Sequence, residues 1–121
     1  MATILFADDE ESIRLLYRDE FEEAGYAVVL AANGHEALEK FVETRPDLLV
    51  VDIKMPGMDG IELVRRLREL STDVPVILCT AYGEFRQNLE TWASDDYIVK
   101  SANLDGLFSK VAALLDRRGA R

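Results

Sequence analysis

The chain has 121 residues, of which 49% are apolar, and 14 Lys and Arg against 23 Asp and Glu give a net charge of −9. This length suits one domain, and a chain of this size can bury enough apolar surface to fold without disulfides or a structural metal. The negative charge argues against binding to nucleic acid or to an anionic membrane, and no apolar run approaches the roughly 18 residues of a membrane span.

Five short apolar runs are strand candidates, and they alternate with segments of helical periodicity. Three of the runs consist almost wholly of Val, Leu and Ile, which is typical of parallel strands buried on both faces. The strands are expected at Thr3–Ala7, Tyr26–Ala31, Leu48–Val51, Val76–Cys79 and Tyr97–Val99. The helices are expected over Glu11–Ala24 and over residues 35–43, 60–70, 84–93 and 104–116.

The order of these segments predicts the fold class. A strand followed by a helix, repeated five times, indicates an α/β fold in which helices cover both faces of a parallel sheet. In the first helix, one apolar stripe should face the sheet, and it consists of Ile13, Leu16, Tyr17, Phe21 and Ala24. The single cysteine, Cys79, lies in an apolar run and is expected to be a small core residue.

Polar residues stand at the ends of four of the five predicted strands. Ligands of open parallel α/β sheets bind outside the carboxyl ends of the strands, so these residues should share one edge of the sheet. They are Asp8 and Asp9 after the first strand, Asp52 at the third, Thr80 at the fourth and Lys100 at the fifth. Each residue alone has a structural explanation, such as an acid that stabilises the start of a helix or caps a turn. Their shared position at one edge of the sheet indicates a functional site.

The chemistry of this set favours a cation and a phosphoryl group. Carboxylates a few Å apart repel one another, and a hard cation such as Mg²⁺ relieves the repulsion at an all-oxygen site. Lys100 adds a positive charge and Thr80 a hydroxyl, so the group can hold a phosphoryl group. Asp52 is the best candidate for a nucleophile that forms an aspartyl phosphate, because it belongs to a central strand and a loop follows it.

These residues resemble the receiver domain of two-component response regulators. The resemblance covers the whole chain, so we expect residues 1–121 to be a single receiver domain. It implies a flavodoxin-like (βα)5 fold with a five-stranded parallel sheet in the order 2-1-3-4-5. It rests on Ile4–Glu10 (ILFADDE), Val51–Gly60 (VDIKMPGMDG), Thr80–Ala81 and Asp95–Lys100.

The resemblance also implies the roles of the acidic residues. Asp52 would accept a phosphoryl group from a sensor histidine kinase or a phosphotransfer protein. Asp9 and Asp52 would bind Mg²⁺ directly, and Asp8 would help through a water molecule. The backbone carbonyl of Lys54 would complete the protein ligands.

The resemblance also implies that phosphorylation changes the conformation of the domain. Lys100 would pair with the phosphoryl oxygens, Thr80 would move to bond the phosphoryl group, and Tyr97 would rotate inward behind it. We expect a downstream protein to read the change on the face formed by the fourth helix, the fifth strand and the fifth helix. The family usually has proline after this lysine, whereas here Ser101 follows, so we expect a trans Lys100–Ser101 peptide.

Two further side chains are expected to control how long the phosphoryl group survives. Lys54 and Tyr82 stand two residues after Asp52 and Thr80, where they could screen the acceptor from an attacking water. This predicts slow self-dephosphorylation. The lone histidine, His35, is expected on the surface of the second helix and not as a phosphodonor.

The leading interpretation is a binding module controlled by phosphorylation, which catalyses only its own phosphorylation and dephosphorylation. A stand-alone receiver and the N-terminal receiver of a truncated transcriptional regulator both fit, and the lack of a linker favours the former. We expect a cytoplasmic protein, since acids stand where a secretory signal would need an apolar stretch, and no contact with nucleic acid or membrane.

Two enzyme-like alternatives fit less well. A Mg²⁺-dependent phosphohydrolase with an aspartyl nucleophile usually needs a second acid where Ile53 and Lys54 stand, and a cap over the substrate. A flavodoxin-like electron carrier would need a phosphate-binding loop after the first strand, where Asp8–Glu11 would repel a flavin phosphate.

Overall fold

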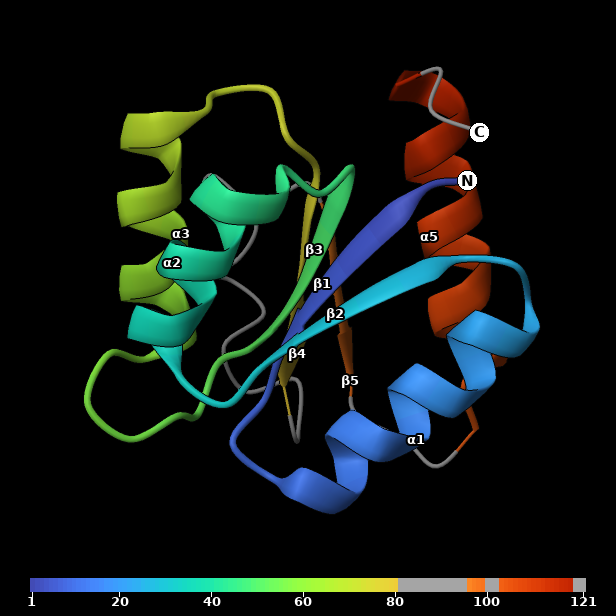
Figure 1. Cartoon of the computed structure of the whole chain (residues 1–121), viewed down its shortest axis with the longest axis horizontal. Helices are drawn as coiled ribbons and strands as arrows, with labels where there is room; N and C mark the ends of the chain where they lie inside the picture. The colour runs from blue at the N-terminus through green and yellow to red at the C-terminus, as the bar shows by residue number, and fades with distance from the viewer. Residues whose placement is uncertain (81–95, 100–102, 119–121) are drawn as a thin grey trace.

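The computed structural model describes residues 1–80, 96–99 and 103–118. Five parallel strands form one sheet in the order β2-β1-β3-β4-β5 (Figure 1). The strands are β1 (Thr3–Ala7), β2 (Ala27–Ala31), β3 (Leu48–Asp52), β4 (Val76–Thr80) and β5 (Asp96–Val99). The helices are α1 (Glu11–Glu23), α2 (Gly34–Thr44), α3 (Gly60–Leu70) and α5 (Asp105–Arg118). The predicted α/β class with a parallel sheet is confirmed, and the helix expected over residues 84–93 lies outside the described residues.

Helices cover both faces of the sheet. Figure 1 shows α2 and α3 on one side and α1 and α5 on the other. The strands supply each layer by alternation: Leu5 and Ala7 of β1 pack in the core beneath α2 and α3, whereas Ile4 and Phe6 pack beneath α1 and α5. This explains why the strands are nearly all apolar, since both faces of a covered parallel sheet are buried.

Aromatic rings fill the layer between the sheet and helices α1 and α5. The Phe21 ring is fully buried, and its centroid lies 4.2 Å from that of Phe108 and 5.0 Å from that of Phe6. Tyr17 stacks on Phe6 with the centroids 4.7 Å apart. The prediction that Leu16 and Ala24 share this stripe is wrong. Leu16 is 37% exposed, and Ala24 is an exposed C-cap after the last residue of α1. Consecutive helical residues are rotated by about 100°, which turns Leu16 away from the line of Tyr17 and Phe21.

Strands β3 and β4 each run one residue further than the apolar pattern predicts. Asp52 is the last residue of β3, where it pairs with Cys79, and Thr80 pairs with Val99 of β5. The backbone ladder therefore includes the polar residues at the strand ends. It fixes the main chain of Asp52 within the sheet, and Cys79 is buried as expected.

The link from β3 to α3 is fixed by a close approach at Gly60. The backbone N–H of Gly60 donates to the carbonyl of Ile53 at 2.8 Å, and Asp59 caps α3 by accepting from the N–H of Glu62 at 2.9 Å. A Cβ on Gly60 would lie 2.4 Å from the carbonyl oxygen of Asp52 and 2.8 Å from Cα of Ile53. The first turn of α3 can therefore approach the end of β3 only with glycine at this position.

We expect Phe21→Ala to lower the free energy of unfolding by about 3–5 kcal/mol, because it removes a fully buried ring and leaves a cavity among other rings. Urea unfolding followed by circular dichroism measures the loss. Leu16→Ala on the same helix is the control and should cost far less, since this side chain is partly exposed. Equal losses in the two variants would contradict the assigned helix face.

We expect Gly60→Ala to destabilise the protein by about 1–3 kcal/mol, because the added methyl group meets rigid backbone atoms. Gly106→Ala is the matched control. A Cβ there lies 3.3 Å from the end of the flexible Ile98 side chain, and alanine favours a helix over glycine by about 1 kcal/mol. Gly106→Ala should therefore leave stability unchanged or slightly raised. A Gly60→Ala variant as stable as the parent would show that α3 does not need this approach.

Candidate metal centre

Three carboxylates converge at the carboxyl edge of the sheet. Asp8, Asp9 and Asp52 each offer an oxygen, and these oxygens all lie within 4.8 Å of one another. Two follow β1 and one ends β3, which are neighbouring strands in which Ala7 pairs with Val51. Continuing this register by one residue places Asp8 beside Asp52. The predicted gathering of these acids is therefore present in the structure.

Burial makes the cluster a demanding electrostatic environment. Asp8 is 1% exposed and Asp52 5%, whereas Asp9 lies at the surface. Charges removed from water are costly unless an opposite charge or hydrogen bonds compensate them, and like charges at this range add repulsion. An all-oxygen set with one open side suits a small hard cation that keeps several waters, so the donors present fit Mg²⁺.

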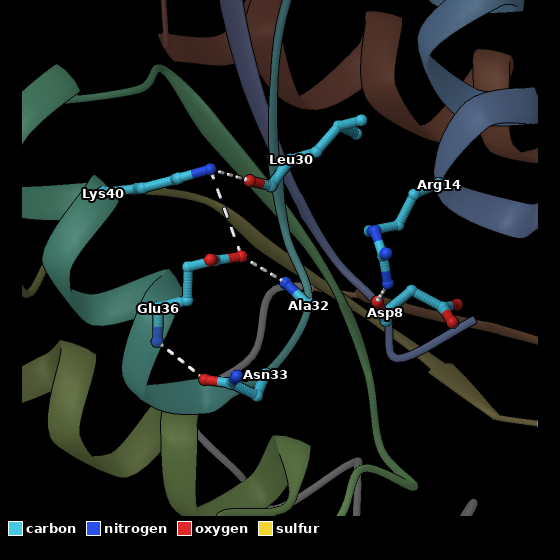
Figure 2. Close-up of polar contacts among 7 residues, drawn as sticks. All are labelled: Asp8, Arg14, Leu30, Ala32, Asn33, Glu36 and Lys40. Carbon is cyan, nitrogen blue, oxygen red and sulfur yellow. Dashed lines mark hydrogen bonds and ion pairs between the residues drawn. The ribbon is translucent and has the colours of Figure 1, made fainter. Parts of the chain in front are cut away.

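Asp8 is held at its main chain and at its side chain. Its backbone N–H donates to the carbonyl of Ala31 at 3.1 Å, which ties it to the end of β2. Its Oδ1 accepts from the backbone N–H of Glu10 at 2.9 Å. Its carbonyl oxygen accepts from Nη1 of Arg14 at 2.9 Å, a contact that reaches back from α1 (Figure 2). The carboxylate is therefore fixed in direction before any ligand binds.

Asp52 is oriented by the loop that follows it. Its Oδ1 accepts from the backbone N–H of Lys54 at 3.3 Å, and the N–H of Ile53 donates to the carbonyl of Cys79 in β4 at 3.0 Å. The main chain of Lys54 thus lies against the Asp52 carboxylate, in the region where its carbonyl was expected to serve as a ligand. The residue itself is exposed.

A shallow groove of about 460 Å³ opens beside the acids along the β3–α3 loop. Its lining is mainly apolar, with Lys54 and two acids at the rim. The buried side chains of Met55 and Met58 anchor this loop in the core under α2 and α3. The lining residues are Asp9, Ile53, Lys54, Met55, Pro56, Asp59 and Ile61.

Side chains of α2 cover the outer edge of β2 near the site. Oε1 of Glu36 accepts from the backbone N–H of Ala32 at 2.6 Å, and Nζ of Lys40 donates to the carbonyl of Leu30 at 2.5 Å (Figure 2). These contacts satisfy main-chain groups that an edge strand would otherwise leave exposed. They also hold the end of β2 to which the main chain of Asp8 is bonded.

A buried tyrosine lies near the acids. Burial is the main cause that raises the pKa of Tyr17 far above its ordinary value, and interactions with Cys79, Asp8 and Asp52 raise it further. Tyr17 therefore stays protonated and adds no negative charge near the cluster.

The remaining predicted site residues fall at or beyond the limits of the described chain. The main chains of Thr80 and Tyr97 lie in β4 and β5, but the expectations for their side chains lie outside what the structure describes. Lys100, Tyr82 and the Lys100–Ser101 peptide also lie outside it. His35 is exposed on α2, as expected.

Three supporting residues, Glu36, Lys40 and Arg14, were missed by the sequence reasoning. The sequence carries a signal for Glu36, because Asn33 stands three residues earlier, which is the spacing of a capping box. In the structure, the Asn33 side chain accepts from the backbone N–H of Glu36 at 2.8 Å. Arg14 had only a weak signal. It lies beside Ile13 at the border of the buried stripe, and nothing in the periodicity shows that its guanidinium reaches back to Asp8. Within the described part of the chain, no helix is long and apolar enough to cross a membrane.

Comparison with known proteins adds independent findings. The family model of the response regulator receiver domain matches residues 4–112. Sporulation initiation phosphotransferase F of Bacillus subtilis is 46% identical over 81 residues, which cover 67% of this chain and 65% of that protein. The PhoB phosphate regulon regulatory protein of Pseudomonas aeruginosa is 43% identical over 97% of this chain. The match spans 53% of PhoB, so this chain covers about half the length of that relative.

Solved structures give the same result. The response regulator protein TrrA from Thermotoga maritima, in complex with Mg(2+)-BeF, superposes with a TM-score of 0.90 at 46% identity. The match covers 95% of this chain and 100% of TrrA. TrrA in complex with the histidine kinase ThkA gives a TM-score of 0.87 at 45% identity, over 95% of this chain and 99% of that one. With its parallel α/β sheet and three acids at one edge, the chain belongs to the receiver domain family of response regulators.

Proposed function

We propose that residues 1–121 form a single receiver domain that acts as a phosphoacceptor switch, with Asp52 as the acceptor. The observation that carries this proposal is the convergence of Asp8, Asp9 and Asp52 within 4.8 Å at the carboxyl edge of the sheet. Asp52 is the member that lies in a central strand, flanked by β1 and β4. The complex of TrrA with a histidine kinase supports a kinase or a phosphotransfer protein as the donor.

The acids would hold Mg²⁺, as the complex of TrrA with Mg(2+)-BeF supports. Asp9 and Asp52 would bind the ion directly, Asp8 through water, and the carbonyl of Lys54 would complete the protein ligands. When bound, the ion neutralises the carboxylates and the oxygens of the incoming phosphoryl group. The hydrogen bond from Glu10 to Asp8 and that from Lys54 to Asp52 keep both carboxylates aimed at the shared position.

The chemical step is a phosphoryl transfer in line. An oxygen of Asp52 attacks phosphorus while the bond from phosphorus to the donor's imidazole nitrogen breaks, and that nitrogen keeps the electron pair. Lys100 and Thr80 would contact the transferred oxygens, and Tyr97 would follow the movement of Thr80. A downstream protein would read the change on the face formed by β5, α5 and the segment over residues 84–93, provided that it binds the two states with different affinity.

We propose that this domain acts in the cytoplasm and catalyses only its own phosphorylation and dephosphorylation. A stand-alone receiver and the receiver of a longer transcriptional regulator both agree with a match to about half of PhoB. A phosphohydrolase would differ by releasing phosphate from a separate substrate with many turnovers, which an assay with a chromogenic phosphate ester would reveal.

Asp52→Asn should abolish labelling by acetyl phosphate in the presence of Mg²⁺, because the amide cannot act as the nucleophile. Mass spectrometry of the intact protein detects the single phosphoryl group on the parent chain. Asp59→Asn is the matched control, since it removes an exposed acid of the same loop and asparagine caps a helix equally well. Stoichiometric acid-labile phosphate on Asp52→Asn would refute the assignment.

Asp9→Ala should weaken Mg²⁺ binding by about tenfold or more, because a site with so few protein ligands loses one of them. Titration calorimetry with MgCl₂ measures the affinity directly. Glu11→Ala removes the same charge two residues later, from the exposed first turn of α1, and should change the affinity much less. Equal effects of the two changes would mean that Asp9 contributes only general negative charge.

A further inference from the structure

Arg14 is placed differently from the exposed arginines of α1 and α3. Its side chain is half-buried and folds back from α1 to the carbonyl of Asp8 (Figure 2). Arg18, one turn later, pairs instead with its neighbour Asp19 at 3.1 Å, with both side chains largely in solvent. Arg65 and Arg66 likewise pair with Glu62 on the surface of α3. Arg14 thus brings a positive charge to a member of the acidic cluster.

A positive charge beside the cluster is favourable whenever no cation is bound. Asp8 and Asp52 are almost fully buried, and their oxygens lie within 4.8 Å of each other and of Asp9. The N–H of Glu10 and the positive end of α1 offset part of this repulsion. The guanidinium contacts the main-chain carbonyl of Asp8 and not its carboxylate. Both groups belong to one residue, so the positive charge lies close enough to the cluster to act on it electrostatically.

We propose that Arg14 is an internal counter-ion of the cluster, which stabilises the metal-free domain and lowers its affinity for Mg²⁺. This inference rests on the proposed function, since it assumes that the three acids bind a divalent cation. The hydrogen bond to the Asp8 carbonyl forms with and without the cation, so it largely cancels in the binding equilibrium. Repulsion between the guanidinium and a doubly charged ion arises only in the bound state. The charge of Arg14 therefore lowers the affinity for Mg²⁺.

The consequence is a site that exchanges one positive charge for another. Without the cation, Arg14 compensates the carboxylates and keeps the β1–α1 loop in its binding geometry. With the cation bound, the same charge opposes it. Cation affinity is then lower than three carboxylates alone would give. The site therefore fills over a higher range of Mg²⁺ concentration.

The test compares two neutral variants with a charged one. Arg14→Met removes both charge and donor, Arg14→Gln removes the charge but keeps an N–H donor, and Arg14→Lys keeps the charge. Calorimetric titration with MgCl₂ at low ionic strength should show at least about threefold tighter binding for both neutral variants. Arg14→Lys should stay within about twofold of the parent. The gain should shrink as NaCl is added, because salt screens partly exposed charges.

Arg18→Met is the control for charge on the same helix. It removes an exposed arginine about 6 Å further along the axis and should leave Mg²⁺ affinity within about twofold of the parent. Urea unfolding gives the second readout: in EDTA, Arg14→Met should be less stable than Arg18→Met, and saturating Mg²⁺ should narrow the difference.

Mg²⁺ binding that is unchanged or weaker in both neutral variants would overturn the inference, and so would equal tightening in Arg14→Lys. Either result would leave Arg14 as a brace for the loop only. Failure of the parent protein to bind Mg²⁺ would instead overturn the proposed function, so the two failures are distinguishable.

Discussion

Three carboxylates held together at one edge of the sheet are the constraint on which the rest of this structure depends. Asp8 and Asp52 are nearly fully buried beside each other, and Asp9 completes the group at the surface. Left alone, such an arrangement repels itself and resists burial. The strand ladder fixes the main chains of β1 and β3. Backbone N–H groups donate to the carboxylates of Asp8 and Asp52, and the guanidinium of Arg14 donates to the Asp8 carbonyl.

The two helical layers support the cluster from opposite faces. From one layer, α1 supplies Arg14, which donates to the Asp8 carbonyl, and Tyr17, which stays neutral near the acids. From the other, α2 holds the end of β2 through Glu36 and Lys40, and α3 approaches the end of β3. The site therefore lies where both layers meet the sheet, and a change in charge there acts on elements of both.

The proposed switch has a physical basis in this site. A cluster that is costly without a cation gains stability when one binds, and that gain is linked to the cation's free concentration. The methionines of the β3–α3 loop anchor it in the core and leave a groove next to Asp9. A phosphoryl group on Asp52 would place new charge at the edge of the strand that pairs with both β1 and β4.

Local chemistry made much of this readable from the sequence. Apolar runs of Val, Leu and Ile located the strands, and acids directly after β1 and at the end of β3 had to share one edge once those strands were parallel. The pattern failed at Leu16, where a broad apolar stripe did not resolve which residues face the sheet. Only the tertiary structure decided that Arg14 reaches the Asp8 carbonyl, that Glu36 and Lys40 cover the edge of β2, and that Gly60 must lack a side chain beside Asp52. These contacts depend on helix phase, side-chain reach and the distance between elements far apart in the chain, and hydrophobic periodicity contains none of the three.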